Sequence, residues 1–150
     1  MKLHLGVIDL PYVDDSGTAK KRKAKVVIET TGDVAEILEK KYGVMQHFFD
    51  AHGDEIASAL EESLAGSLET LLMGGPSSID LYASAAAKIE ERFHRFLESK
   101  EMDAMGVPGV PTLASLLGIS HRFKRKRGPP RPSFIDTGAY SANFKIWLDE

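Results

Sequence analysis

The sequence contains no cysteine and no apolar stretch long enough to cross a bilayer. The missing cysteines exclude disulfide frameworks, thiolate zinc sites, iron–sulfur clusters and cysteine nucleophiles. A membrane-spanning helix needs about 20 consecutive apolar residues, and the segment from Met1 to Asp9 is too short and too interrupted for a signal peptide. The 150 residues, 43% hydrophobic and 27% charged, are typical of one globular domain. We therefore expect a soluble intracellular protein with a single domain, 1–150, and no contact with a membrane.

Patterns for catalysis, metal binding and phosphate binding are also missing. His47 and His52 are five residues apart, not the three or four that place two ligands on one helical face. There is no HExxH pattern and no Gly-x-Ser-x-Gly elbow. Gly74-Gly75-Pro76 lacks the lysine that follows in a phosphate-binding loop. We expect no catalytic residues, no metal and no cofactor, and surface or interface positions for the histidines, which are His4, His47, His52, His94 and His121.

Positive charge is concentrated in two short clusters. The first consists of Lys20, Lys21, Arg22, Lys23 and Lys25, and the second of Arg122, Lys124, Arg125, Lys126, Arg127 and Arg131. Together they hold 11 of the 19 basic residues, so the rest of the chain has 8 basic against 22 acidic residues, a formal charge of −14. Two interpretations stay open: the clusters are solvated loops, or their field attracts other copies of the chain or an anionic partner.

Hydrophobic periodicity predicts an α+β fold. The predicted strands are 2–10, 23–29 and 143–148. The predicted helices are 34–72, one from Ser77 or Ser78 to about Met102, and 113–117 after a Thr112 cap. The first helix is either continuous or two collinear helices, with Thr31 or Asp33 as its cap and a break or kink at Gly43 or Gly53. Its apolar stripe includes Phe48 and Phe49, which we expect in the core.

These elements predict a small antiparallel sheet, formed by the N-terminal hairpin and the C-terminal strand and packed against two long antiparallel helices. The basic clusters lie in irregular segments near 11–25 and 119–133. We expect both loops to be mobile in the monomer.

Two motifs suggest further functions. Asp136-Thr137-Gly138-Ala139 is the string found in aspartic proteases, where two aspartates share a proton. Only 12 residues follow Gly138, too few for the sheet and flap of a dimeric protease, so we expect Asp136 or Thr137 to cap a turn and Gly138 to adopt a positive φ. The segment from His121 to Arg127 could instead bind nucleic-acid phosphates, with Phe123 stacking on a base. A DNA-associated accessory protein therefore stays an alternative.

A string near the C-terminal end of the sequence resembles the "R-P-x-apolar-D-T-G-x-apolar" ending of tailed-bacteriophage virion-morphogenesis proteins of the tail-completion or head–tail joining class. Here it consists of Arg131, Pro132, Ser133, Phe134, Ile135, Asp136, Thr137 and Gly138, followed by Ala139 and Tyr140. In that family a proline-containing loop leads to the Asp-Thr-Gly turn, a short helical turn and a closing strand. The predicted order of elements before the motif also resembles the family layout.

The resemblance implies a non-enzymatic structural protein that forms a ring in the neck between capsid portal and tail. It implies a virion location, assembly in the bacterial cytoplasm, and contacts with its own copies, with other neck, portal or tail proteins, and with packaged DNA. A tail terminator or another tail subunit is the nearest alternative. In a ring, the acidic helices of one copy could meet the basic loops of the next, and such heterologous contacts close only if the rotation per subunit divides a full turn.

Overall fold

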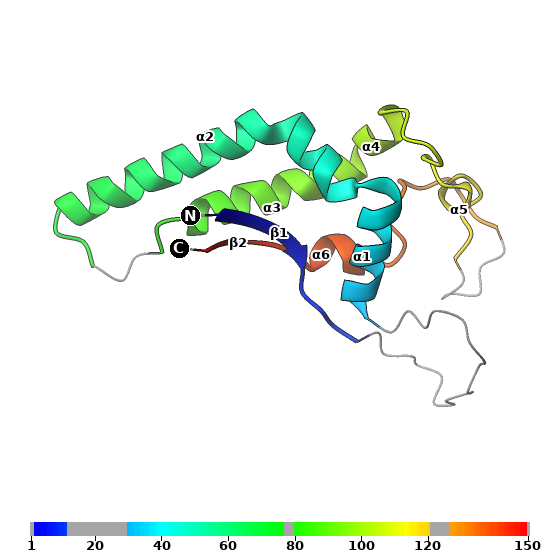
Figure 1. Ribbon diagram of the computed structural model, residues 1–150, viewed down its shortest axis with the longest axis horizontal. Coiled ribbons are helices and arrows are strands. Elements are labelled where there is room, and N and C mark those ends of the chain that lie inside the picture. The colour runs from blue at the N-terminus through cyan, green and yellow to red at the C-terminus, as the bar shows by residue number, and fades with distance from the viewer. Residues whose placement is uncertain (1, 12–29, 77–79, 121–126, 150) are drawn as a thin grey trace.

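The computed structural model of the chain describes residues 2–11, 30–76, 80–120 and 127–149 (Figure 1). Its elements follow in the order β1 (Lys2–Val7), α1 (Thr31–Tyr42), α2 (Val44–Leu72), α3 (Ala83–Glu98), α4 (Glu101–Ala104), α5 (Leu113–Leu116), α6 (Ala139–Ala142) and β2 (Phe144–Asp149). The fold is therefore a mixture of helix and strand, as the sequence predicted.

The two ends of the described chain form one antiparallel sheet. β1 pairs with β2 in a register that runs from Lys2 opposite Asp149 to Val7 opposite Phe144. Alternate apolar side chains of both strands pack against the core, namely Leu3, Leu5, Val7, Phe144 and Ile146. The pairing confirms the predicted sheet between the chain ends, although β1 ends at Val7. The predicted strand 23–29, the other half of the N-terminal hairpin, lies outside the described residues.

A glycine separates the first two helices. Thr30 caps α1, because its Oγ1 accepts a hydrogen bond from the Asp33 amide at 3.2 Å while the Asp33 carboxylate accepts one from the Thr30 amide at 3.1 Å. The cap is thus Thr30 and not the predicted Thr31 or Asp33. α1 ends at Tyr42 and is followed by Gly43, whose φ of +59° favours glycine. α1 turns away from the line of α2 in Figure 1. The predicted break at Gly43 is confirmed, but the two helices are not collinear.

α2 bends at His52, one residue before Gly53, where φ is −122° and ψ is 17°. Contacts between α2 and α3 run in reverse order along the two helices: Glu55 bonds Arg92, whereas Ser63, further along α2, bonds the amide of Ala85 near the start of α3. α3 begins at Ala83, later than predicted, and ends at Glu98. The predicted start at 77 or 78 falls on residues outside the described ranges.

Four phenylalanines form the centre of the core between helices and sheet. Phe48, Phe93 and Phe96 are fully buried and Phe144 is 1% exposed. The rings of Phe93 and Phe144 stack with centroids 3.9 Å apart, and Phe48 meets Phe93 edge-on at 5.1 Å. Phe49, in contrast, is 44% exposed, so the prediction that both neighbouring phenylalanines lie in the core is confirmed only for Phe48.

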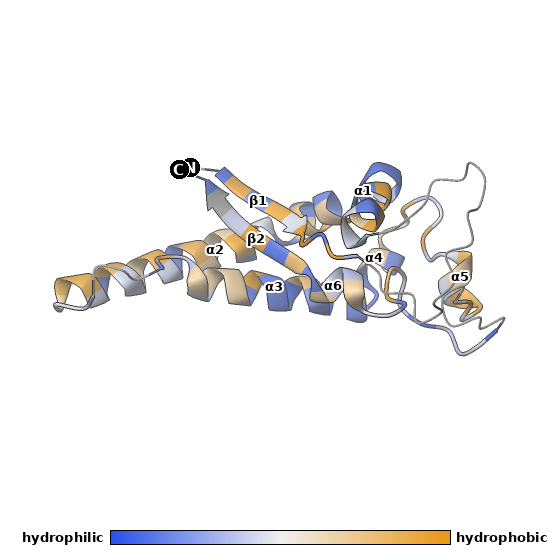
Figure 2. Ribbon diagram, turned by 90° about the horizontal axis from the view of Figure 1, so that it is seen from below, coloured by the Kyte–Doolittle hydropathy of each residue, from blue (hydrophilic) through white to orange (hydrophobic). Residues whose placement is uncertain are grey.

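The described part of the molecule is elongated. The outer end of α2 lies at one end of its longest axis and α5 at the other, in both views (Figures 1 and 2). Ser67 donates a hydrogen bond to the carbonyl of Leu81 at 3.3 Å, just before α3 begins. The last turn of α2 therefore extends beyond the start of α3.

Candidate interaction surfaces

The basic clusters are only partly within the described residues. All of the first cluster lies outside them, as do Arg122, Lys124, Arg125 and Lys126 of the second. Arg127 is described and exposed. The residue after it, Gly128, donates its amide hydrogen to the carbonyl of Leu117 at 3.0 Å, and the amide of Arg131 bonds the carbonyl of Ser115 at 3.0 Å. Mobility was predicted for the second loop, near 119–133, but its described end is held against α5.

Arg131 fastens this loop to the Asp-Thr-Gly turn. Its guanidinium donates to the Asp136 carboxylate at 2.6 Å and to the carbonyl oxygens of Ile135 and Ile119, both at 2.7 Å. The other carboxylate oxygen of Asp136 accepts a hydrogen bond from Ser120 at 2.9 Å. Charge-assisted hydrogen bonds of this kind are the strong ones in proteins. The contacts of Arg131 therefore lie within its own chain, and its predicted role toward a neighbouring subunit stays a prediction.

The turn itself has the predicted geometry. The Thr137 hydroxyl accepts a hydrogen bond from the Ala139 amide at 3.2 Å, and Gly138 has a φ of +78°. The turn leads directly into α6 and then β2. Before it, Pro132 is half-buried and Ser133 is buried, with its hydroxyl accepting from the Thr112 amide at 3.1 Å. Asp136, whose carboxylate bonds Arg131 and Ser120, therefore holds this turn against the second basic loop.

The short helix α5 is built as predicted. Thr112 caps it by accepting a hydrogen bond from the Ser115 amide at 3.2 Å, and Gly118 follows with a φ of +60°. A Cβ at position 118 would lie 2.5 Å from the carbonyl carbon of Gly128. The close approach explains how the loop that contains Arg127 packs directly on the end of α5.

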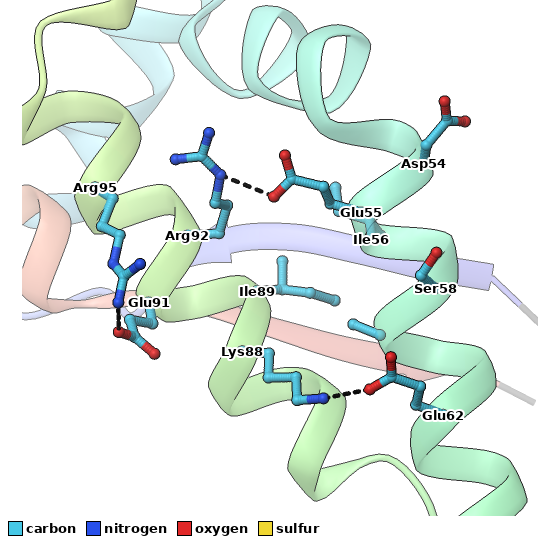
Figure 3. Close-up of a pocket in the computed structure, with 11 residues that line it drawn as sticks. Asp54, Glu55, Ile56, Ser58, Glu62, Lys88, Ile89, Glu91, Arg92 and Arg95 are labelled. Atoms are coloured by element: carbon cyan, nitrogen blue, oxygen red, sulfur yellow. Dashed lines mark hydrogen bonds and ion pairs between the residues drawn. The ribbon is translucent and has the colours of Figure 1, made fainter.

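A groove of about 450 Å³ lies between α2 and α3 (Figure 3). Ile56, Ala59 and Ile89 supply its apolar part. Charged side chains along it come from both helices, and two ion pairs cross the groove, Arg92 with Glu55 at 2.9 Å and Lys88 with Glu62 at 2.5 Å. Arg95 pairs with Glu91 within α3. These two cross-pairs join α2 to α3, so we describe the groove as a seam between the two helices.

The seam continues into a cluster of ionisable groups at the bend of α2. Nε2 of His52 lies 2.8 Å from Glu101 and Nδ1 lies 3.2 Å from Glu55, while Arg92 reaches Glu101 at 3.0 Å as well as Glu55. The His52 hydrogen bond, helped by Arg92, lowers the pKa of Glu55. Burial raises the pKa of Glu101, but hydrogen bonds from His52, Ser99 and Arg92 outweigh it and leave that pKa below its ordinary value. The cluster ties α2, α3 and α4 together.

The cluster corrects the expectation for one histidine. His52 is only 6% exposed, so it is not at the surface. Its partner Glu101 is 49 residues away in the sequence, and no local spacing pattern could reveal the pair.

Large apolar side chains are exposed at both ends of the long axis. On α2 these are Leu64, Leu68 and Leu72, followed by Met73, and they are 37%, 49%, 84% and 80% exposed. On α5, Leu113 is 70% and Leu116 is 49% exposed. Figure 2 shows hydrophobic residues at the outer end of α2 and on α5. The three leucines recur at helical spacing within the predicted helix 34–72, and the structure leaves them exposed at the outer end of α2.

Comparison with known proteins identifies no relative: no family model matches the chain, and no curated protein or solved structure matches it significantly. Within the described ranges, no His, Asp and Glu side chains gather in a group that could hold a metal ion. No helix among the described residues is both long and apolar enough to cross a membrane.

Proposed function

We propose that the chain is a structural subunit of a tailed-bacteriophage virion and assembles as a ring at the head–tail junction. Its body is a small antiparallel sheet packed against two long antiparallel helices. Its partners are its own copies and other neck, portal or tail proteins, and it acts without catalysis or a cofactor. It is assembled in the bacterial cytoplasm and remains in the virion.

The folded motif at the end of the chain carries this proposal. The family that the motif resembles has a proline-containing loop, an Asp-Thr-Gly turn, a short helical turn and a closing strand. Pro132, the turn at Gly138, α6 and β2 follow in that order here. The bond between Arg131 and Asp136, at 2.6 Å, joins the two charged residues of the motif. The motif is thus one structural unit, which supports the resemblance beyond a match of letters.

The division of charge supports assembly with copies of the same chain. α2 carries six acidic residues and no lysine or arginine: Asp50, Asp54, Glu55, Glu61, Glu62 and Glu69. Only Glu55 and Glu62 form ion pairs with described residues of α3. In a ring, the acidic face of one copy can meet the basic loop of the next, and the complementary fields favour this orientation over others.

Reversing charge in the second basic cluster tests the proposal. Replacing Arg125, Lys126 and Arg127 with glutamate should prevent ring formation in electron micrographs while circular dichroism shows an unchanged fold. The matched control replaces three exposed lysines from other parts of the chain, Lys2, Lys41 and Lys100, and should assemble normally. Unaltered rings in the first variant would contradict the proposed charge contact.

The position in the virion is tested separately. An antibody against the chain should label the junction between capsid and tail in assembled particles. Labelling along the tail or at its tip would favour another tail subunit instead. If the chain is a DNA-associated protein, its affinity for duplex DNA should fall steeply with salt, and virions should not be labelled at all.

A further inference from the structure

We propose that copies of this chain dock head to tail, with the apolar outer end of α2 on one copy seated against α5 of the next. The α2 surface consists of Leu64, Leu68, Leu72 and Met73, and the α5 surface of Leu113 and Leu116. This inference rests on the proposed function, because it presupposes that copies of the chain meet, and it names the surfaces through which they do so.

Each surface is a continuous apolar face. Leu64, Leu68 and Leu72 are four residues apart and therefore share one side of α2. Their exposure rises from 37% to 84% toward the end of the helix, where α2 extends past α3. On α5, Leu113 and Leu116 are three residues apart and also share a face. Apolar faces left uncovered in a monomer mark sites of interaction with another molecule.

Charge decides which surfaces pair. Glu61 and Glu69 lie on the same part of α2 as the leucines, and neither has an ion pair with a described residue. Beside α5 stands exposed Arg127, in the loop that Gly128 holds against the carbonyl of Leu117. If two α2 ends met, the carboxylates of one copy would repel those of the other. If two α5 surfaces met, their two Arg127 side chains would repel each other. Pairing α2 with α5 places opposite charges at the edge of the contact.

The positions of the two surfaces fit a ring. They lie at opposite ends of the longest axis (Figures 1 and 2). A contact between two different surfaces is heterologous, so a growing row of copies keeps one free surface at each of its two ends until the ring closes. Surfaces at opposite ends allow one copy to bind two neighbours at once.

A pair of complementary variants tests the docking. In Leu72→Glu the α2 surface is lost and the α5 surface remains, whereas in Leu113→Glu the reverse holds. Each substitution should raise the dissociation constant for self-association by about 10- to 100-fold, so each protein alone should sediment as a monomer. Mixed in equal amounts, they should form a dimer of one copy of each, because one intact α2 surface meets one intact α5 surface. Ile8→Glu, at an apolar side chain that is 45% exposed elsewhere, should assemble like the unmodified chain.

Other outcomes overturn the docking. If Leu113→Glu alone still dimerises, two α2 surfaces meet each other; if Leu72→Glu alone does, two α5 surfaces meet. If the unmodified chain forms rings and both variants do so too, other surfaces build the ring, and the docking fails while the proposed function stands. If the mixture forms the expected dimer but the unmodified chain grows only into open fibres, the docking stands and the ring function fails. An unmodified chain that stays monomeric at high concentration overturns both.

Discussion

Replacing Glu101 with glutamine should destabilise the protein in a way that depends on pH. Glu101 accepts hydrogen bonds from His52 at 2.8 Å, Arg92 at 3.0 Å and Ser99 at 3.0 Å. A hydrogen bond to a charged group contributes about 1.5–3 kcal/mol. Glutamine keeps one acceptor oxygen, and the Glu101 side chain is 31% exposed. We therefore expect the free energy of unfolding to fall by about 1–2 kcal/mol at pH 7.

The difference in stability between the unmodified protein and Glu101→Gln should become smaller in acid. The pKa of Glu101 lies below the ordinary value of 4.5 in the folded chain, so the unfolded chain binds its proton first. The stability that the carboxylate contributes is complete above pH 4.5 and is lost as pH falls through the lower, folded pKa. Glutamine does not titrate, so the two proteins should approach equal stability below that pH.

Urea denaturation at a series of pH values measures this difference. Glu98→Gln is the matched control, because Glu98 is exposed at the end of α3 and has no ion pair with a described residue. Its effect should stay within about 0.5 kcal/mol at every pH. The role of the cluster would be refuted if Glu101→Gln were as stable as this control. It would also be refuted if the loss of stability in Glu101→Gln were as large at pH 3 as at pH 7.

Three further predictions concern the packing of the core and of the second loop. Gly118→Ala and Gly106→Ala both place alanine at a positive φ, but only at Gly118 does the new Cβ meet backbone, at 2.5 Å. Gly118→Ala should therefore lower the free energy of unfolding by at least about 2 kcal/mol more than Gly106→Ala does. Equal melting temperatures of the two variants would argue against the close approach. Phe93→Ala should lower the free energy of unfolding by about 3–5 kcal/mol, whereas Phe49→Ala, at a side chain 44% exposed, should lower it far less. Urea denaturation measures both changes, and similar losses of stability would contradict the assigned core. Asp136→Asn removes the charge that faces an arginine at 2.6 Å and should cost about 1–3 kcal/mol; an unchanged thermal transition would show that this bond does not hold the loop.

Local signals in the sequence predicted most of the elements. Alternating apolar residues marked β1 and β2. Of the two glycines predicted to break or kink the first helix, Gly43 separates α1 from α2. Thr112 and Gly118 correctly bounded the short helix, and Gly138 the turn before α6. Each of these signals acts within a few residues, where a cap, a turn or a repeat has the same physical meaning in any fold.

Prediction failed where the outcome depends on distant contacts. Two adjacent phenylalanines fit the same apolar stripe, yet Phe48 is buried and Phe49 is 44% exposed. The periodicity of a helix does not say how much of its surface other elements cover. His52 was predicted at a surface or interface position, yet it is buried and bonds a glutamate 49 residues away in the sequence. The basic residues of the first cluster lie outside the described ranges, so their predicted role stays a prediction.

By itself the sequence determined the division of charge, the lack of thiol chemistry, the mixed fold and the motif that suggests a virion protein. Only the tertiary structure decided that Arg131 binds Asp136 within its own chain. It also decided that α2 extends beyond the start of α3, so that Leu72 is 84% exposed. The reason is that composition and periodicity describe which side chains are charged or apolar along one element. What covers them is set by where other elements begin, end and turn.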